Sequence, residues 1–556
     1  MRPIARPPLE WAGAVFFFAS RRSRPTAIMD GLTMPNEGVQ IMSTATATET
    51  NTLPAHYGRL LELARETQLI GGCASMLGWD QEVLMPSGGI AYRGEQLALL
   101  AKMHHEMNTS QAFSDALAEC ESDSELTSDP HSPSAVNIRE FRWAFDRRTK
   151  LPASLVEEEA KLSSEGMHAW KEARAKNDFS MFSPSLRKII DMLRRKAECY
   201  GWGEGGEPWD ALAEDYEKGC TAEWVASVFT PLRERLQGLL DDVMGAAKSP
   251  SNAFNEIELP VEDQKRFVKM VAAQFGFDFD RGRLDESTHP FCSGSHCNDI
   301  RMTTRFHVAN INDALGSTMH ETGHGLYEQG LLAKYIGSPM GDSISLGIHE
   351  SQSRMWENQV GRSESFWRWC EPKLKEHFGK DVAGLSFDDV YGGANVVKPD
   401  FIRVEADEAT YNMHIMIRFE LERAILSGDL DVDDIPAAWN AKYKEYLGLD
   451  VPNDASGCLQ DIHWSMTSMG YFPTYTLGNL YCAQFFEKAV EDHPGMHEEF
   501  ARGEFGSLLS WLRGNIHEHG QRYRAAELCE VVTGKPLSAD PLMRHLESKL
   551  RPLYGV

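Results

Sequence analysis

The chain has 556 residues, of which 42% are hydrophobic and 25% are charged, as is usual for a globular protein. Its formal net charge of −26 argues against nucleic acid or an anionic membrane surface as the main partner. No apolar run reaches the length of a membrane span, and the ten cysteines are scattered rather than arranged as a disulfide framework. These features predict a cytoplasmic protein with reduced thiols.

The first residues carry no pattern of a folded core. Residues 11–19 form an apolar run after two arginines, as in a signal peptide, but the run is short and basic residues follow it. A Ser/Thr/Ala-rich stretch that opens at Met42 is typical of a cytosolic N-terminus. We therefore expect residues 1–50 to be a disordered tail or an over-extended start, with secretion as the alternative, and residues 51–556 to form a single domain.

From Leu53 onward the hydrophobic pattern is helical almost throughout. The best strand signal is Arg301–Val308, where a strand would offer an edge to an extended peptide. Residues 121–135 are an acidic loop rich in Ser and Pro. The pattern predicts a mainly α fold, with helices at 57–74, 97–107, 134–150, 154–175, 183–200, 209–216, 222–246, 259–275, 363–377, 407–426 and 433–447.

The pattern H-E-x-x-H occurs at residues 320–324, within a further predicted helix. On a helix, His320 and His324 lie on one face, one turn apart, and two imidazoles so placed can bind one zinc ion. Glu321 lies beside them and can reach a water on that metal. The bare pattern also arises by chance, and a histidine on a helix is more often structural than a ligand.

The flanks of this motif make two further predictions. Asn312 or Asp313 is expected to cap the start of the helix. Gly323 and Gly325 each weaken a helix by about 1 kcal/mol relative to Ala. We therefore expect a close approach to the backbone at these glycines, for example by a substrate.

A third ligand strengthens the metal interpretation. Glu350 lies 30 residues after His320, which is enough for a turn and a return helix beside the first. Two His and one Glu leave a fourth position open for water, as catalytic zinc sites require. A second metal site at Cys292 and Cys297, near His289 and His296, is a weaker alternative, because the spacing is not that of a zinc knuckle.

Five other short strings accompany the H-E-x-x-H motif in a fixed order. Together they resemble the six signature motifs of the Taq-type thermostable carboxypeptidases, a family of zinc metallocarboxypeptidases with a helical zincin fold similar to angiotensin-converting enzyme and neurolysin. The resemblance extends loosely through Trp79–Pro86 and Gly470–Tyr475, but does not account for the first 41 residues. The five strings are His289–Phe291, Asp299–Thr303, His349–Gln352, Ile402–Asp407 and Gly457–Trp464.

The resemblance implies a fold, a reaction and partners. It implies two helical lobes around a deep cleft, with a small β-sheet beside the His320 helix and residues 51–556 as one catalytic metallocarboxypeptidase domain. The reaction is release of single C-terminal amino acids from peptides with a free C-terminus. One Zn²⁺ per chain and a homodimer are expected, and whether Co²⁺ substitutes for zinc stays open.

The motifs also assign roles. Glu321 is expected to take a proton from the attacking water and return it to the leaving amine. His463, Tyr471 and Tyr475 are the candidates to stabilise the oxyanion, although either tyrosine could instead be a core residue. The metal ligands are His320, His324 and Glu350.

An arginine should bind the terminal carboxylate of the substrate, because a guanidinium matches a carboxylate with two hydrogen bonds. The resemblance places Arg403 first, with Arg301 and Arg354 second, although each could be a structural ion pair. The groups expected to orient a ligand imidazole or an arginine are Asp299, Gln352, Asp407 and Asp461.

Two alternative functions remain at this point. An oligoendopeptidase or dipeptidyl carboxypeptidase would share the zinc site and the general base. A non-catalytic, zinc-stabilised scaffold is the more distant alternative, and Glu321 argues against it, because a structural site has no use for a carboxylate beside the ligands.

Overall fold

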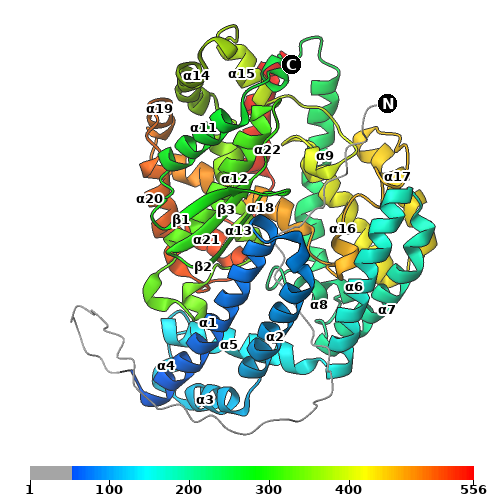
Figure 1. Ribbon diagram of the computed structural model, residues 1–556, viewed down its shortest axis with the longest axis vertical. Coiled ribbons are helices and arrows are strands. Elements are labelled where there is room, and N and C mark those ends of the chain that lie inside the picture. The colour runs from blue at the N-terminus through cyan, green and yellow to red at the C-terminus, as the bar shows by residue number, and fades with distance from the viewer. Residues whose placement is uncertain (1–52) are drawn as a thin grey trace.

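The computed structural model describes residues 53–556, and these residues are mostly helical (Figure 1). The tail expected for residues 1–50 lies outside this range. Within residues 53–556, no helix combines the length and apolar character that a membrane crossing requires. The helices are α1 (Ala55–Val83), α2 (Ile90–Asn108), α3 (Gln111–Ser122), α4 (Ser124–Thr127), α5 (Pro133–Lys150), α6 (Ala153–Lys176), α7 (Ser183–Tyr200), α8 (Pro208–Ala213), α9 (Ala222–Met244), α10 (Ala253–Glu256), α11 (Val261–Gln274), α12 (Ile311–Gly330), α13 (Leu346–Arg354), α14 (Glu364–Phe378), α15 (Phe387–Ala394), α16 (Tyr411–Ser427), α17 (Ile435–Leu447), α18 (Pro473–Asp492), α19 (Met496–Ala501), α20 (Gly506–Asn515), α21 (Ala525–Thr533) and α22 (Asp540–Tyr554).

The predicted helices are confirmed, with differences at their ends. The first continues to Val83, nine residues beyond its expected end at residue 74. The predicted loop at 121–135 contains the short helix α4, whose N-cap Asp123 accepts a hydrogen bond from the backbone N–H of Glu125. Such a cap satisfies one of the free N–H groups at a helix start, which explains why an acidic, Ser-rich segment folds as a helical turn.

A three-stranded sheet lies beside α12, as Figure 1 shows. Its strands are β1 (Gly282–Glu286), β2 (Phe291–His296) and β3 (Asp299–Thr304), in the order β1-β3-β2. β3 pairs in parallel with β1 and antiparallel with β2. The predicted strand Arg301–Val308 is therefore only half right: the strand starts at Asp299 and ends at Thr304, because Arg305 turns away to donate two hydrogen bonds to Asp313.

The start of α12 also differs from the prediction. Neither Asn312 nor Asp313 caps this helix. Asn310 occupies the N-cap position with a left-handed φ of 68° and makes no side-chain cap hydrogen bond. The carboxylate of Asp313 accepts from Arg305 instead.

The two glycines of α12 are needed for packing inside the protein. A Cβ at Gly323 would lie 2.4 Å from the carbonyl oxygen of Gln352, so α12 and α13 touch backbone to backbone there. A Cβ at Gly325 would lie 2.7 Å from the ring of Phe277. The close approach that the glycines predicted is real, but protein atoms fill the space expected for substrate.

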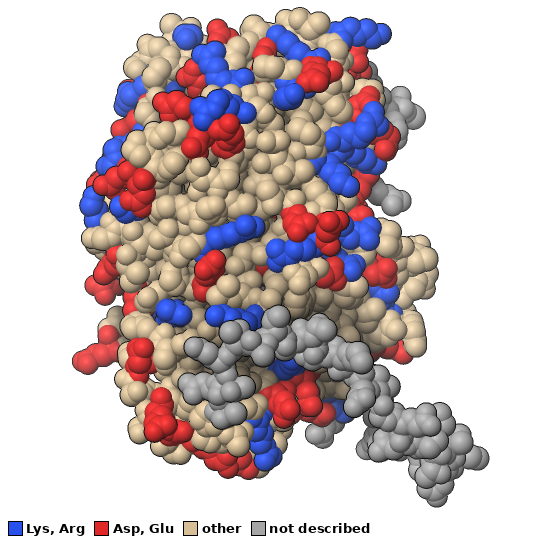
Figure 2. All heavy atoms as spheres, turned by 90° about the vertical axis from the view of Figure 1, so that its left-hand side faces the viewer, with Lys and Arg blue, Asp and Glu red and all other residues tan. Residues whose placement is uncertain are grey.

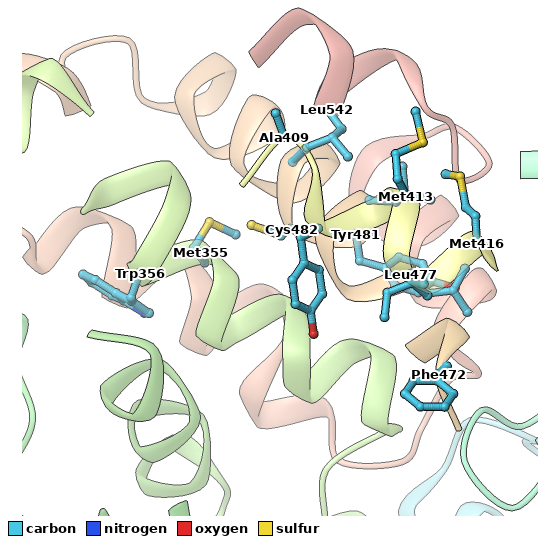
Figure 3. Close-up of a cluster of buried hydrophobic side chains, with 14 of the residues drawn as sticks. Met355, Trp356, Ala409, Met413, Met416, Phe472, Leu477, Tyr481, Cys482 and Leu542 are labelled. Atoms are coloured by element: carbon cyan, nitrogen blue, oxygen red, sulfur yellow. The ribbon is translucent and has the colours of Figure 1, made fainter. Parts of the chain in front are cut away.

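Buried apolar residues pack α18 against both α13 and α16. One hydrophobic cluster extends from Leu155 to Tyr554, and a smaller one joins α1, α3, α4 and α5. In Figure 3, Met355 follows α13 and lies near Cys482 of α18, while Met413 comes from α16. A Cβ at Gly478 of α18 would lie 2.6 Å from Cγ of Glu350, so this helix presses directly on the Glu350 side chain.

The surface does not gather its excess acidic charge in one place on the face that Figure 2 shows. Acidic and basic side chains intermingle there, with uncharged surface between them.

Candidate metal centre

Three side chains from α12 and α13 converge on one point. The nearest donor atoms of His320, His324 and Glu350 all lie within 4.8 Å of one another. Nε2 of each histidine is 3.6 Å from Oε2 of Glu350. Two imidazole nitrogens and a carboxylate oxygen in this arrangement fit a divalent transition metal with an open coordination position. The predicted ligand set is therefore brought together in space.

The alternative metal site is not formed. In the part of the chain that the structure describes, His320, His324 and Glu350 are the only three potential ligands that gather in this way. Cys297 Sγ lies 3.7 Å from Nδ1 of His296, but Cys292 and His289 do not complete a ligand group with them.

The far nitrogen of His320 contacts a carboxylate. Its Nδ1 lies 2.9 Å from Oε2 of Glu357, which also accepts from Arg354 at 3.0 Å. Burial alone raises the pKa of Glu357, but Arg354 and His320 outweigh it and hold that pKa far below its usual range. The ionised carboxylate accepts the Nδ1 proton, so Nε2 of His320 keeps its lone pair for a metal.

The far nitrogen of His324 contacts another imidazole. Its Nδ1 lies 2.6 Å from Nδ1 of His349, whose Nε2 is 2.8 Å from Oε1 of Glu328. Burial lowers the pKa of His324 well below its usual value, and His349, His320 and Arg354 add to the shift.

These supporting groups were not predicted, although residue spacing in the sequence carries a signal for one of them. Glu328 follows His324 by four residues, as His324 follows His320, so all three lie on one face of α12. Glu357 lies in η5 (Met355–Val360), a π-helical segment that continues α13. Such segments are frequent at functional sites.

Glu321 is buried, with 5% of its surface exposed. Burial raises the pKa of Glu321 to about 7, with Glu350 adding to the shift and His320 opposing it. A carboxylate with a pKa near neutrality can both accept and return a proton, which is the property required of a general base.

The three predicted oxyanion candidates form one cluster. The ring centroids of His463 and Tyr471 are 5.3 Å apart, as are those of Tyr471 and Tyr475. Burial lowers the pKa of His463 to about 3 and raises that of Tyr471 to about 12, so both groups are neutral. Tyr475 lies on α18, whose backbone at Gly478 touches the Glu350 side chain, so the cluster lies beside the metal ligands.

The three candidate arginines each have an acidic partner. Arg403 donates from Nε and Nη2 to Oδ1 of Asp461, at 3.0 and 2.8 Å, and is 4% exposed. Arg301 on β3 pairs with Asp299 and lies over the ring of Trp79. Arg354 donates to Glu350 at 2.7 Å as well as to Glu357, so it belongs to the support of the metal ligands.

Of the four groups expected to orient a ligand or an arginine, two do so in the structure and two do not. Asp461 and Asp299 hold arginines, as predicted. Gln352 contacts His517 with its Oε1, and Asp407 accepts backbone N–H groups ahead of α16, so neither holds a ligand or an arginine. The ligand imidazoles are held by Glu357 and His349 instead.

Comparison with known proteins gives matches along nearly the whole chain. A model of the family described as carboxypeptidase Taq (M32) metallopeptidase matches residues 59–550. Thermostable carboxypeptidase 1 of Thermus thermophilus is 42% identical over 508 residues, which are 90% of this chain and 99% of the relative. Thermostable carboxypeptidase 1 of Pyrococcus furiosus is 37% identical over 499 residues, with coverages of 88% and 97%.

Solved structures agree with the sequence comparison. The crystal structure of the M32 carboxypeptidase from Deinococcus radiodurans matches with a TM-score of 0.87 at 39% identity, covering 90% of this chain and 100% of that one. Fold, motif order and relatives therefore lead to one assignment: the chain belongs to the M32, or Taq-type, family of metallocarboxypeptidases.

Proposed function

We propose that this enzyme is a zinc-dependent carboxypeptidase that releases single C-terminal amino acids from peptides. The observation that carries the proposal is the convergence of His320, His324 and Glu350 on one point, in a chain of the M32 family. Zinc is the proposed metal because this donor set is the one that zinc uses in catalytic sites. Co²⁺ prefers similar ligands and is expected to substitute.

The proposed chemistry uses Glu321 as the proton carrier. A divalent ion held by His320, His324 and Glu350 would lower the pKa of a water and polarise the scissile carbonyl. Glu321 takes a proton from the attacking water and passes it to the amine of the departing amino acid. The burial of Glu321 next to the ligand His320 supports this role.

His463, Tyr471 and Tyr475 are proposed to donate hydrogen bonds to the oxygen that becomes negative in the transition state. Both ring nitrogens of His463 lack a hydrogen-bond partner within residues 53–556, although the side chain is buried. Orphaned buried polar atoms are costly and call for an explanation. A bound substrate carbonyl would give the neutral imidazole its acceptor.

Arg403 remains the first candidate to bind the terminal carboxylate, with Arg301 and Arg354 second. Its guanidinium is held by Asp461 and by the hydroxyl of Tyr411 at 3.0 Å, so its orientation is set before substrate arrives. Preorganised charge of this kind binds without the entropy cost of ordering a flexible side chain.

The test of this function is a digest of peptides with free and amidated C-termini, followed by mass spectrometry with and without a chelator. The proposal expects loss of one residue at a time from the free C-terminus, abolished by the chelator, and little cleavage of the amide. Equal cleavage of the amide would favour an oligoendopeptidase. Removal of residue pairs would favour a dipeptidyl carboxypeptidase, and bound zinc with no cleavage would favour a scaffold.

We also propose a homodimer, from the family resemblance, and a cytoplasmic location, from the scattered cysteines. The net charge of −26 favours peptides rather than nucleic acid or an anionic membrane as partners. Light scattering on the purified protein tests the dimer, and a single-chain mass would contradict it.

A further inference from the structure

The two metal histidines have different supports. His320 contacts the carboxylate of Glu357 directly, whereas His324 reaches the carboxylate of Glu328 only through the ring of His349. The second arrangement is a chain of three groups, and its proton positions follow from the distances.

Two nitrogens at 2.6 Å must share one proton. Two N–H groups would repel each other at this distance, as would two lone pairs, so exactly one of the Nδ1 atoms of His324 and His349 donates. On the other side of the His349 ring, the Glu328 oxygen at 2.8 Å accepts a proton from Nε2. The His349 tautomer that donates from Nε2 to Glu328 has a lone pair on Nδ1.

The proton between the rings therefore belongs to His324. With Nδ1 of His324 protonated, its Nε2 carries a lone pair that points toward Glu350 and His320. In the reverse arrangement Nε2 of His324 would hold the proton, and the imidazole would be lost as a ligand.

We propose that Glu328 and His349 are a positioning pair that selects the metal-binding tautomer of His324 and fixes its ring. This inference rests on the proposed metal binding by His320, His324 and Glu350, and it assigns to two further residues a role toward that metal.

Packing supports the pair as a rigid unit. The His349 ring lies between the rings of His324 and Tyr327, at centroid distances of 4.5 and 5.3 Å. The hydroxyl of Tyr327 accepts from the backbone N–H of Ile344, shortly before α13 begins. Because Glu328 belongs to α12 and His349 to α13, the pair also links the two helices that carry the ligands.

The experiment compares His349→Phe with His349→Gln. Phenylalanine keeps the ring between its neighbours but cannot accept a proton, whereas glutamine can accept from His324 and donate to Glu328. His349→Phe should raise the Kd for Zn²⁺, measured by chelator competition, by about 10- to 100-fold. It should also change the visible absorption of the Co²⁺-loaded protein, and His349→Gln should recover most of both properties.

The matched control is His517→Phe. His517 is buried and its ring centroid lies 4.9 Å from that of Tyr327, but its hydrogen bond is to Gln352 and not to a metal ligand. It should lose stability to a similar extent, while keeping the native Zn²⁺ affinity. Glu328→Gln, at a side chain that is 28% exposed, should fold and show a loss of affinity smaller than that of His349→Phe.

The outcomes separate this inference from the proposed function. Native Zn²⁺ affinity in both His349→Phe and Glu328→Gln would overturn the positioning pair and leave the metal site intact. An equal loss in His517→Phe would also overturn it, because the effect would then be one of packing. A wild-type protein that binds no Zn²⁺ would overturn both proposals.

Discussion

The two sides of the site differ in how their buried charged groups are paired. On the α12–α13 side, Arg354, Glu357 and His349 hold the ligands, while His320 Nε2, His324 Nε2 and Glu350 Oε2 point to a common position. On the side formed by residues 403–475, the single carboxylate of Asp461 accepts from both Arg403 and Arg418, so this group of three keeps a net positive charge. The first side suits a cation, whereas the second presents neutral donors where negative charge would develop.

The two sides meet at Tyr411. The guanidinium of Arg354 lies 4.5 Å from the centre of its ring, and its hydroxyl accepts from Arg403 at 3.0 Å. A single aromatic side chain thus contacts the support of the metal ligands and the candidate for substrate recognition. Variants on each side should therefore be compared for metal content as well as for rate.

The largest effect is expected on the metal side. Glu321→Gln should lower kcat/KM by about 10²- to 10⁴-fold, because an amide cannot take up the proton. Zinc content should stay native, whereas Glu350→Ala should lose metal and activity together. Steady-state kinetics with metal analysis on the same samples measures both. A Glu321→Gln enzyme that binds zinc and turns over at the native rate would disprove the proposed mechanism.

Substitution of Asp461 should lower the free energy of unfolding. Asp461→Asn should cost about 3–5 kcal/mol in the free energy of unfolding, because two buried arginines lose a charged partner. Asp299→Asn is the matched control: Asp299 is 37% exposed, so the loss of its pair with Arg301 should cost about 0–1 kcal/mol. Urea unfolding of the metal-free proteins measures both. Equal costs would show that burial does not distinguish the two pairs.

The ion pairs of Asp461 should also make the stability of the fold depend on pH. Burial alone raises the pKa of Asp461, but Arg403 and Arg418 hold it far below its usual range. A folded-state pKa below the unfolded value gives stability that is complete above about pH 4 and is lost as the pH falls further. The wild type should therefore lose more stability than Asp461→Asn on acidification below pH 4. An equal loss of stability in the two proteins below pH 4 would contradict the ion pair.

The variants Tyr471→Phe and Tyr475→Phe should differ in kcat. If one phenol donates to the oxyanion, its removal should lower kcat by about 10²- to 10³-fold, as for other single oxyanion donors. Tyr471→Phe and Tyr475→Phe each remove one hydroxyl and keep the ring. We expect a large loss in one variant and a small one in the other, both with native zinc content. Two small losses would leave His463 as the donor.

Features that depend on local spacing could be predicted from the sequence, whereas contacts between distant elements could not. The placement of His320 and His324 on one face of α12 follows from helical spacing, which is local, and the structure brings Glu350 of α13 to the same point, as expected. β1 and β2 were not predicted, because β2 is half-buried along its whole length and gives no alternation of burial. The contact between His324 and His349 joins two helices, and no local pattern states which side chains will meet across them.

The smallest effect concerns Arg403, whose partner Asp461 lies 58 residues away in the chain. The loss of a charge-assisted hydrogen bond to a desolvated carboxylate costs roughly 1.5–3 kcal/mol, so Arg403→Ala should lower kcat/KM by about 10- to 200-fold. Arg403→Lys should recover only part, because an ammonium lacks the planar fork. The ratio of rates on free-acid and amidated peptides is the sharper measure, since a loss of packing would lower both rates alike.

Arg418→Lys is the control for that measurement. Arg418 shares Asp461 with Arg403 and is fully buried, so its substitution disturbs the same ion pair. It should destabilise the fold and keep the acid-over-amide preference, whereas Arg403→Ala should lose most of that preference with native zinc content. If Arg403→Ala keeps the full preference, the carboxylate is bound elsewhere. Arg301 is then the next candidate, because Arg354 already holds two carboxylates beside the metal ligands.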